Sequence, residues 1–156
     1  MTTIQIQVAC LYTSDTWYID GTHSTAPAQF AQLFCIRVAA AESTYVTAVY
    51  GLLPGKTQHH YEEYLTAILD TCLHRDIRPI PTTIVVDYEM AIHNAVRAIF
   101  GQHLRIQGCF YHLTQATWRR VQAEGLQRAY REEEAIRDYC GMIDGLAFLP
   151  INLVSE

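Results

Sequence analysis

The sequence lacks the features that mark secreted, membrane-spanning or repetitive proteins. No apolar run approaches the roughly 18 residues that a membrane helix needs. Residues 1–12 alternate polar and apolar types without a basic start, which does not fit a signal peptide. Internal repeats and low-complexity segments are also absent. A chain of 156 residues with this pattern is expected to form one globular domain that is not bound to a membrane.

Cysteine pairs at the spacing of metal or redox motifs are missing. The cysteines are odd in number and scattered, without a Cys-x-x-Cys motif: Cys10, Cys35, Cys72, Cys109 and Cys140. This pattern indicates reduced, mostly buried thiols and not a disulfide framework. We therefore expect a protein that is not secreted, located in the nucleus if the source is eukaryotic and otherwise in the cytoplasm.

Positive charge is scarce, and lysine is nearly absent. Ten arginines and Lys56 stand against 16 acidic residues, so the net charge is −5 with histidine neutral. Since phosphate contacts supply most of the affinity for nucleic acids, an acidic chain is a poor stand-alone nucleic-acid binder. Five arginines gather at positions 119, 120, 128, 131 and 137. They form either a phosphate-facing patch or one side of a solvated helix, and the acids at 132–134 favour the helix.

Hydrophobic patterns predict an alternation of strands and helices. Strands are expected at Thr16–Asp20, Phe34–Ala41, Tyr45–Leu53, Thr82–Asp87 and Leu104–Cys109. Helices are expected after the N-cap Thr57 as far as Cys72, and at Met90–Phe100, Leu113–Glu124 and Glu132–Ala147. Residues 3–12 fit either an extra edge strand or a loose extension. The short polar gap at 42–44 makes the second and third strands a hairpin.

This order predicts an α/β fold, with an antiparallel hairpin and parallel strands in one mixed sheet and helices on both faces. The strands that end in Asp20 and Asp87 are apolar on both faces and should be central neighbours. Parallel neighbours lie about 4.8 Å apart, so both carboxylates would project from the end of the sheet where α/β ligands bind. Such a pair favours a cation such as Mg²⁺ between the carboxylates. The alternative, that each aspartate merely ends a strand, stays open at this point.

Several motifs resemble the transposase domain of Mutator-like elements (MULE). They are Asp20-Gly-Thr-His23, Gly51-Leu-Leu-Pro54 with Thr57 and Tyr61, Asp87-Tyr-Glu-Met-Ala91, Ile106-Gln-Gly-Cys-Phe-Tyr-His112 with Gln115 and Trp118, and Leu146-Ala-Phe-Leu-Pro150. They follow the family's order over about residues 16–150. The resemblance implies an RNase H-like fold of the DDE class. It also implies a transposase that uses Mg²⁺ or Mn²⁺ to hydrolyse and join DNA phosphodiesters.

The resemblance assigns roles to individual residues. Asp20 and Asp87 would be the first and second catalytic acids and the metal ligands. Cys109 and His112 match the family's Cys-x-x-His pair and would arrange the cleft or contact the DNA end without binding zinc. From the residues alone, Cys109 reads instead as a buried thiol and His112 as a residue that caps the next helix.

Two further side chains near these motifs have alternative interpretations. His23 departs from the aromatic residue that usually follows Asp-Gly-Thr in the family. It is either a phosphate contact or a surface histidine. Glu89 is either a hydrogen-bond acceptor beside the acids or a helix N-terminal acid stabilised by the macrodipole.

The family's third acid, a glutamate, is not recognisable in the chain, and we expect it beyond Glu156. The in-chain candidates do not stand in a matching context: Glu124, Glu132, Glu133, Glu134 and Glu156. We expect residues 1–125 to form the catalytic core without its last acidic element, and 126–156 to begin a helical insertion. The predicted function is therefore a fragment of a DDE transposase whose partners are transposon ends and target DNA, with homo-oligomerisation left open. The alternative is a non-catalytic, transposase-derived module that binds DNA or protein.

Overall fold

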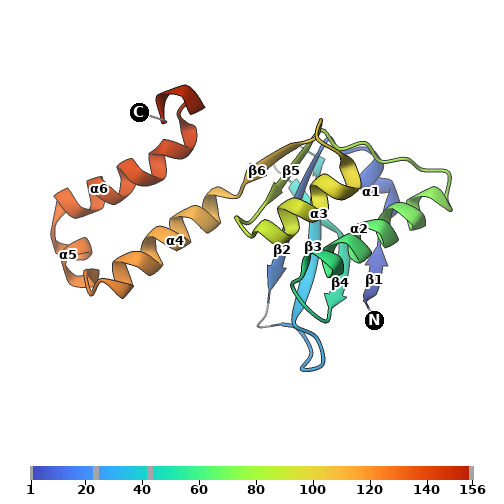
Figure 1. Cartoon of the computed structure of the whole chain (residues 1–156), viewed down its shortest axis with the longest axis horizontal. Coiled ribbons are helices and arrows are strands. Elements are labelled where there is room, and N and C mark those ends of the chain that lie inside the picture. The colour runs from blue at the N-terminus through green and yellow to red at the C-terminus, as the bar shows by residue number, and fades with distance from the viewer. Residues whose placement is uncertain (1, 23–24, 42–43, 155–156) are drawn as a thin grey trace. The chain divides into compact units, whose positions relative to one another are not determined.

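The computed structural model describes residues 2–22, 25–41 and 44–154, so His23 lies outside the described residues (Figure 1). The chain divides into two compact units, Met1–Gln107 and Gly108–Glu156. Among the described residues, no helix has both the length and the apolar character needed to cross a membrane. The unit boundary falls before the boundary expected at residue 125 from the family's organisation, which stays a prediction.

A six-stranded mixed sheet forms the first unit, in the order β1-β4-β3-β2-β5-β6. The strands are β1 (Thr3–Ile6), β2 (Thr16–Thr22), β3 (Gln32–Ala41), β4 (Thr44–Leu53), β5 (Thr83–Val86) and β6 (Arg105–Gly108). Pairing is antiparallel from β1 through β4 and β3 to β2, and parallel between β2 and β5. This confirms the predicted hairpin and the predicted parallel neighbours. Of the two options for residues 3–12, the edge strand holds for β1, and the short helix α1 (Val8–Tyr12) follows it.

Two longer helices of this unit begin and end at residues suited to helix termini. Helix α2 (Gln58–Leu73) begins after Thr57, whose hydroxyl accepts a hydrogen bond from the His60 amide at 3.4 Å, as predicted for an N-cap. Helix α3 (Met90–Phe100) ends at Gly101, whose φ of 83° is a conformation that glycine adopts without strain. Both helices occupy the ranges that the sequence pattern predicted.

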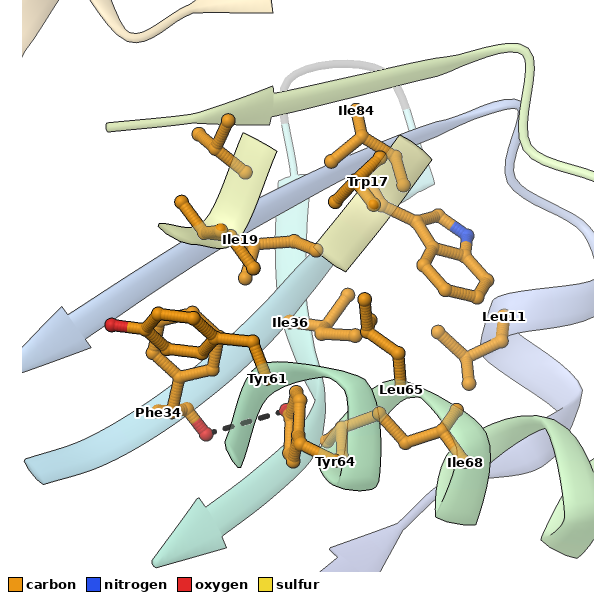
Figure 2. Packing of buried hydrophobic residues seen from close by; sticks show 14 of the residues in the cluster. Leu11, Trp17, Ile19, Phe34, Ile36, Tyr61, Tyr64, Leu65, Ile68 and Ile84 are labelled. Atoms are coloured by element: carbon orange, nitrogen blue, oxygen red, sulfur yellow. Dashed lines mark hydrogen bonds between the residues drawn. The ribbon is translucent and has the colours of Figure 1, made fainter. Parts of the chain in front are cut away.

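The core of the first unit lies between these helices and one face of the sheet (Figure 2). Trp17 is fully buried and packs edge-to-face on Phe100 of α3, with ring centroids 5.7 Å apart. The ring of Phe34 lies 5.3 Å from that of Tyr64 on α2, whose hydroxyl donates to the Phe34 carbonyl at 3.4 Å. The Tyr64 ring leaves no room for a side chain at Gly51 of β4. The glycine of the Gly-Leu-Leu-Pro motif therefore lets α2 approach the sheet closely.

The opposite face of the sheet is more polar. Residues of β2 alternate, so that Trp17 and Ile19 are buried whereas Tyr18 is half-buried and Asp20 is exposed. The described helices of the first unit pack on the Trp17 face, as the core shows. Within this unit the helices thus cover one face, not both. The prediction that β2 is apolar on both faces was wrong, because Tyr18 and Asp20 give its second face a polar character.

The second unit is helical, with α4 (Phe110–Ala123), α5 (Gln127–Glu132), α6 (Glu134–Gly145) and the short 3-10 turns Leu146–Phe148 and Ile151–Leu153. Helix α4 begins before the predicted Leu113, α5 was not predicted, and the helix predicted from Glu132 begins only at Glu134, as α6. The extended backbone of Glu133, with φ −108° and ψ 118°, separates α5 from α6. A break there was not predicted because no glycine or proline marks it.

The late arginines lie on solvated helix surfaces. Arg120 pairs with Glu124 at 2.6 Å, and Arg128 pairs with Glu132 at 2.9 Å, each one helical turn apart. All four side chains are at least half exposed, where such pairs contribute about 0.3–0.5 kcal/mol. These contacts agree with the interpretation as a helix face, which the acids within the cluster had favoured.

Candidate functional site

Strand pairing brings Asp20 level with Asp87. The parallel ladder of β2 and β5 pairs Thr16 with Thr83 and Tyr18 with Val85. Continued by two residues, this register sets Asp20 opposite Asp87. The alternation of side chains places Asp20 on the face that carries Tyr18 and Val85, and its continuation by one residue past β5 assigns Asp87 to the same face. The two predicted acids therefore come from neighbouring parallel strands and the same face of the sheet.

The position of Asp20 within its strand differs from the prediction. The sequence suggested that β2 closes at Gly21, but β2 continues to Thr22 and pairs with β3 throughout. Asp20 thus lies inside the antiparallel ladder, opposite Cys35, and only the parallel ladder with β5 ends before it. Asp87, by contrast, directly follows the last residue of β5, as expected. A glycine was read as a strand end, whereas here it permits a close contact described below.

The two acids differ in exposure and in their neighbours. Asp20 is exposed, and burial together with the charge of Asp20 raises the pKa of the neighbouring Cys35 thiol. Asp87 is half-buried, and its Oδ1 accepts a hydrogen bond from the Tyr88 amide at 2.6 Å. The Nε2 of His93 lies 2.7 Å from the Asp87 carbonyl oxygen, which ties the start of α3 to the end of β5. His93 therefore contacts the backbone of Asp87, and the Tyr88 amide contacts its carboxylate.

This donor set fits a hard divalent cation. Mg²⁺ and Mn²⁺ prefer carboxylate oxygens and keep several water ligands, so one or two carboxylates suffice to hold them. Asp20 and Asp87 supply such oxygens from one accessible face. Across the described residues, no group of three or more His, Cys, Asp or Glu side chains is arranged for a metal ion.

A buried hydrogen-bond chain lies behind this end of the sheet. Gln32, only 2% exposed, donates from Nε2 to the Tyr61 hydroxyl at 3.1 Å and to the Gly55 carbonyl at 3.3 Å. Tyr61 in turn donates to Glu89 Oε2 at 3.1 Å. Both interpretations of Glu89 agree with the structure, because Glu89 accepts this hydrogen bond and also occupies the N-cap position of α3, where the macrodipole favours its charge. The chain links β3, α2 and the β5–α3 loop that carries Asp87.

Gly21 is packed against this chain. A Cβ atom at Gly21 would stand 2.5 Å from Gln32 Oε1 and 2.9 Å from the Phe34 ring. No side chain fits there without displacing Gln32 or Phe34. The glycine of the Asp-Gly-Thr motif thus lets Gln32 lie directly beside β2, one residue after Asp20.

Sequence reasoning did not single out Gln32 or His93. Neither stands in a recognisable motif, and both act through partners on other elements. Tyr61 was noted only as part of the family pattern, and its period in α2 marked it as a core residue. Its hydroxyl contact with Glu89 depends on how α2 and α3 pack together and leaves no local signal.

The ionisation of Tyr61 gives this hydrogen-bond chain a signature at high pH. Burial, followed by the charges of Glu89 and Asp87, raises the pKa of Tyr61 to about 12, although the hydrogen bond from Gln32 lowers it. Between pH 10 and 12 the Tyr61 hydroxyl therefore keeps its proton in the folded state, whereas in the unfolded chain it loses the proton. The contribution of this group to the free energy of unfolding is complete below pH 10. It is lost as the pH rises towards 12, which lowers the free energy of unfolding by about 2 kcal/mol.

We expect Tyr61→Phe to reduce the loss of stability between about pH 9 and about pH 11.5 by about 2 kcal/mol. Urea unfolding at both pH values measures the difference. Tyr12→Phe, a change at a tyrosine that is 63% exposed on α1, serves as the matched control and should behave like wild type. Equal alkaline losses in wild type and Tyr61→Phe would contradict the raised pKa.

Cys109 and His112 belong to the second unit. Cys109 occupies the N-cap position of α4 without a side-chain capping bond and is half-buried. His112 lies in the first turn of α4, half-buried, and its ring packs edge-to-face on Tyr111 at 5.8 Å. The thiol is less buried than the reading from residues alone suggested. A role for this pair at the cleft or DNA end stays a prediction.

A family model matches most of the chain. Residues 16–116 match the family model described as "MULE transposase domain". The matched range includes Asp20, the Gln32–Tyr61–Glu89 chain and Asp87, and it extends into α4. No curated protein matches the sequence. Because the match covers more than half of its residues, the chain belongs to the MULE transposase domain family.

Proposed function

We propose that this chain is part of the catalytic core of a DDE-type DNA transposase with an RNase H-like fold. In this proposal Asp20 and Asp87 hold a divalent metal ion, and the complete protein hydrolyses and joins DNA phosphodiesters. The observation that carries the proposal is the β2–β5 register, which sets the two aspartates level on one accessible face within a family of transposase domains. The third carboxylate of the DDE class would come from beyond Glu156.

The residues around the acids suggest how the site would work. Asp87 Oδ1 accepts a hydrogen bond from the Tyr88 amide, and the carboxylate keeps lone pairs with which it would bind the ion. Asp20, exposed on β2, would bind it from the neighbouring strand. When bound, Mg²⁺ or Mn²⁺ supplies Lewis-acid activation of an attacking water or 3′-hydroxyl and neutralises the leaving oxygen.

The surrounding hydrogen bonds would restrict the motion of the second acid. His93 contacts the Asp87 carbonyl, while Tyr61 fixes Glu89 two residues further on. Held at both points, the β5–α3 loop would keep Asp87 in a fixed position beside β2. Such orientation of ligands by neighbouring groups typically accounts for a 10–100-fold difference in metal affinity.

Localised oxidative cleavage tests the metal site directly. Fe²⁺ occupies oxygen-ligand sites, and with ascorbate and peroxide it generates radicals that cut the polypeptide beside the ion. We expect backbone cuts close to residues 20 and 87, suppressed by excess Mg²⁺ and lost in Asp87→Ala. Asp15→Ala, at an exposed aspartate that precedes the opposite end of β2, should retain them. Cuts that persist in Asp87→Ala, or that fall elsewhere, would refute the site.

A non-catalytic, transposase-derived binding module is the second candidate. The net charge of −5 favours it, because an acidic chain carries few phosphate contacts. A plasmid-nicking assay with Mn²⁺ separates the two functions. Without a third carboxylate the 156-residue chain should nick weakly. Robust nicking abolished by Asp20→Ala would place the third ligand within these residues, whereas DNA binding without a metal site would favour the binding module.

A further inference from the structure

An aromatic hollow lies on the same sheet face as the two acids. Tyr18 of β2, Arg37 of β3 and Tyr45 of β4 line a cavity of about 390 Å³. Tyr18 and Arg37 are direct cross-strand partners, and Tyr45 pairs with Ala39, two residues beyond Arg37 on β3. The alternation of side chains places all three lining residues on the polar face, away from the helices of the first unit. We call these three residues the tyrosine–arginine pocket.

The two rings of the tyrosine–arginine pocket stand at right angles. Their centroids are 5.2 Å apart and the interplanar angle is 88°. Tyr45 is 52% exposed, so about half of its side chain is accessible to a ligand. A hydrogen bond with Tyr45 is the main cause that raises the pKa of Tyr18, so the two hydroxyl groups lie close together. The pocket therefore offers two flat apolar walls and hydroxyl groups at their edges.

Arg37 supplies the charge of the pocket. It is exposed, and none of the ion pairs found among the described residues involves it. An arginine that is not engaged by a carboxylate keeps its guanidinium available for an anion, and its planar donors match a phosphate. Positive charge is scarce on this chain, which makes its location beside two tyrosines informative.

These features match one kind of ligand. Unpaired bases stack on aromatic side chains, and positive groups beside them follow the phosphate backbone. A base inside a duplex is stacked on both of its faces, so neither face is free to stack on a tyrosine ring. An acidic peptide would satisfy Arg37 but would not need two aromatic rings beside it. The pocket therefore fits a single-stranded nucleotide better than a duplex or a peptide.

The pocket lies close to the acids along one strand. Tyr18 precedes Asp20 by two residues on the same face, a separation of about 7 Å along the strand. One nucleotide step rises about 3.4 Å in stacked B-form DNA and spans more in an unpaired strand, so the two sites are at most about two nucleotides apart. We propose that Tyr18, Arg37 and Tyr45 bind an unpaired base and its phosphate next to the DNA phosphodiester at Asp20 and Asp87. The binding of single strands stands by itself, and only the placement beside the reacting phosphodiester rests on the proposed function.

Binding of a labelled oligothymidylate to the whole chain, in low salt with EDTA, tests this proposal. We expect Tyr45→Ala to weaken binding about tenfold, since one base–aromatic stack contributes that much, and Tyr45→Phe to keep most of the affinity. Arg37→Gln should weaken binding and lower the salt dependence by about one phosphate contact. Tyr12→Ala, at a tyrosine that is 63% exposed on α1, is the matched control and should bind like wild type. Circular dichroism confirms that each variant is folded.

Photocrosslinking locates the bound strand. An oligonucleotide carrying 5-iododeoxyuridine should crosslink to Tyr18 or Tyr45, and a duplex of the same sequence should not. Absence of crosslinks, crosslinks at other surfaces, or equal binding by wild type and Tyr45→Ala would overturn the proposal. Because EDTA removes divalent metal, this result does not depend on the acid pair. If the chain crosslinks at the pocket but shows no ferrous cleavage at residues 20 and 87, the proposed function is refuted and the binding of single strands is not.

Discussion

Saturating Mn²⁺ should raise the midpoint of thermal unfolding of the wild-type chain by about 5–10 °C, and Asp20→Asn should remove this shift. A ligand that binds only the folded state stabilises it by about 2.7 kcal/mol at one hundred times its dissociation constant. For a chain of this size each kcal/mol moves the midpoint by about 2–4 °C. Asparagine has nearly the shape of aspartate but not its charge, so the variant isolates the contribution of the carboxylate.

The fluorescence of Trp17 makes this measurement specific to the first unit. Trp17 is fully buried beside the sheet, while Trp118 belongs to the second unit. In a Trp118→Phe background, the unfolding signal therefore reports the unit that contains the acids. Asp15→Asn, which removes an exposed carboxylate just before β2, is the charge-matched control and should keep the full shift. An equal Mn²⁺ shift in Asp20→Asn and wild type would rule out Asp20 as a ligand.

Local patterns predicted the parts of the fold whose stability is local. The β3–β4 hairpin followed from two β-branched runs around a short polar gap, and α3 followed from its apolar period and terminal glycine. Helix α5 was missed and the start of α6 was placed two residues early, because no glycine or proline near Glu133 marks a helix end. The end of β2 was also misplaced, because Gly21 remains in the strand to accommodate Gln32.

The candidate site was predictable where it depends on strand order alone. Parallel pairing of two apolar strands was enough to bring Asp20 and Asp87 to one end, and the ladder of β2 and β5 confirms that pairing. The supporting residues were not predictable in the same way. Gln32 and Tyr61 are 29 positions apart, and Tyr61 and Glu89 are 28 positions apart. Such hydrogen bonds depend on how α2 and α3 pack on the sheet, which no period or spacing in the sequence records.

Gly21→Ala should destabilise the chain by about 1–3 kcal/mol, the usual cost of inserting a methyl group into a well-packed core. The new Cβ would overlap Gln32 Oε1 and crowd the ring of Phe34. Displacement of Gln32 would also break its hydrogen bond to Tyr61 and loosen the connection to Glu89. We therefore expect weaker binding of Mn²⁺ together with lower stability. Urea unfolding and calorimetric titration measure the two effects.

A double-mutant cycle distinguishes this mechanism from a general intolerance of alanine. If Gln32 is the main obstacle, Gly21→Ala should cost about half as much in a Gln32→Ala background, because only the Phe34 contact then remains. Gly141→Ala, inside α6 with no atom within 4 Å of the added Cβ, should instead stabilise its helix by about 0.5–1 kcal/mol. Additive effects of the Gly21 and Gln32 substitutions would show that the two residues act independently. In that case the glycine beside Asp20 would be required by Phe34 and the core, and not by the hydrogen-bond chain that supports Asp87.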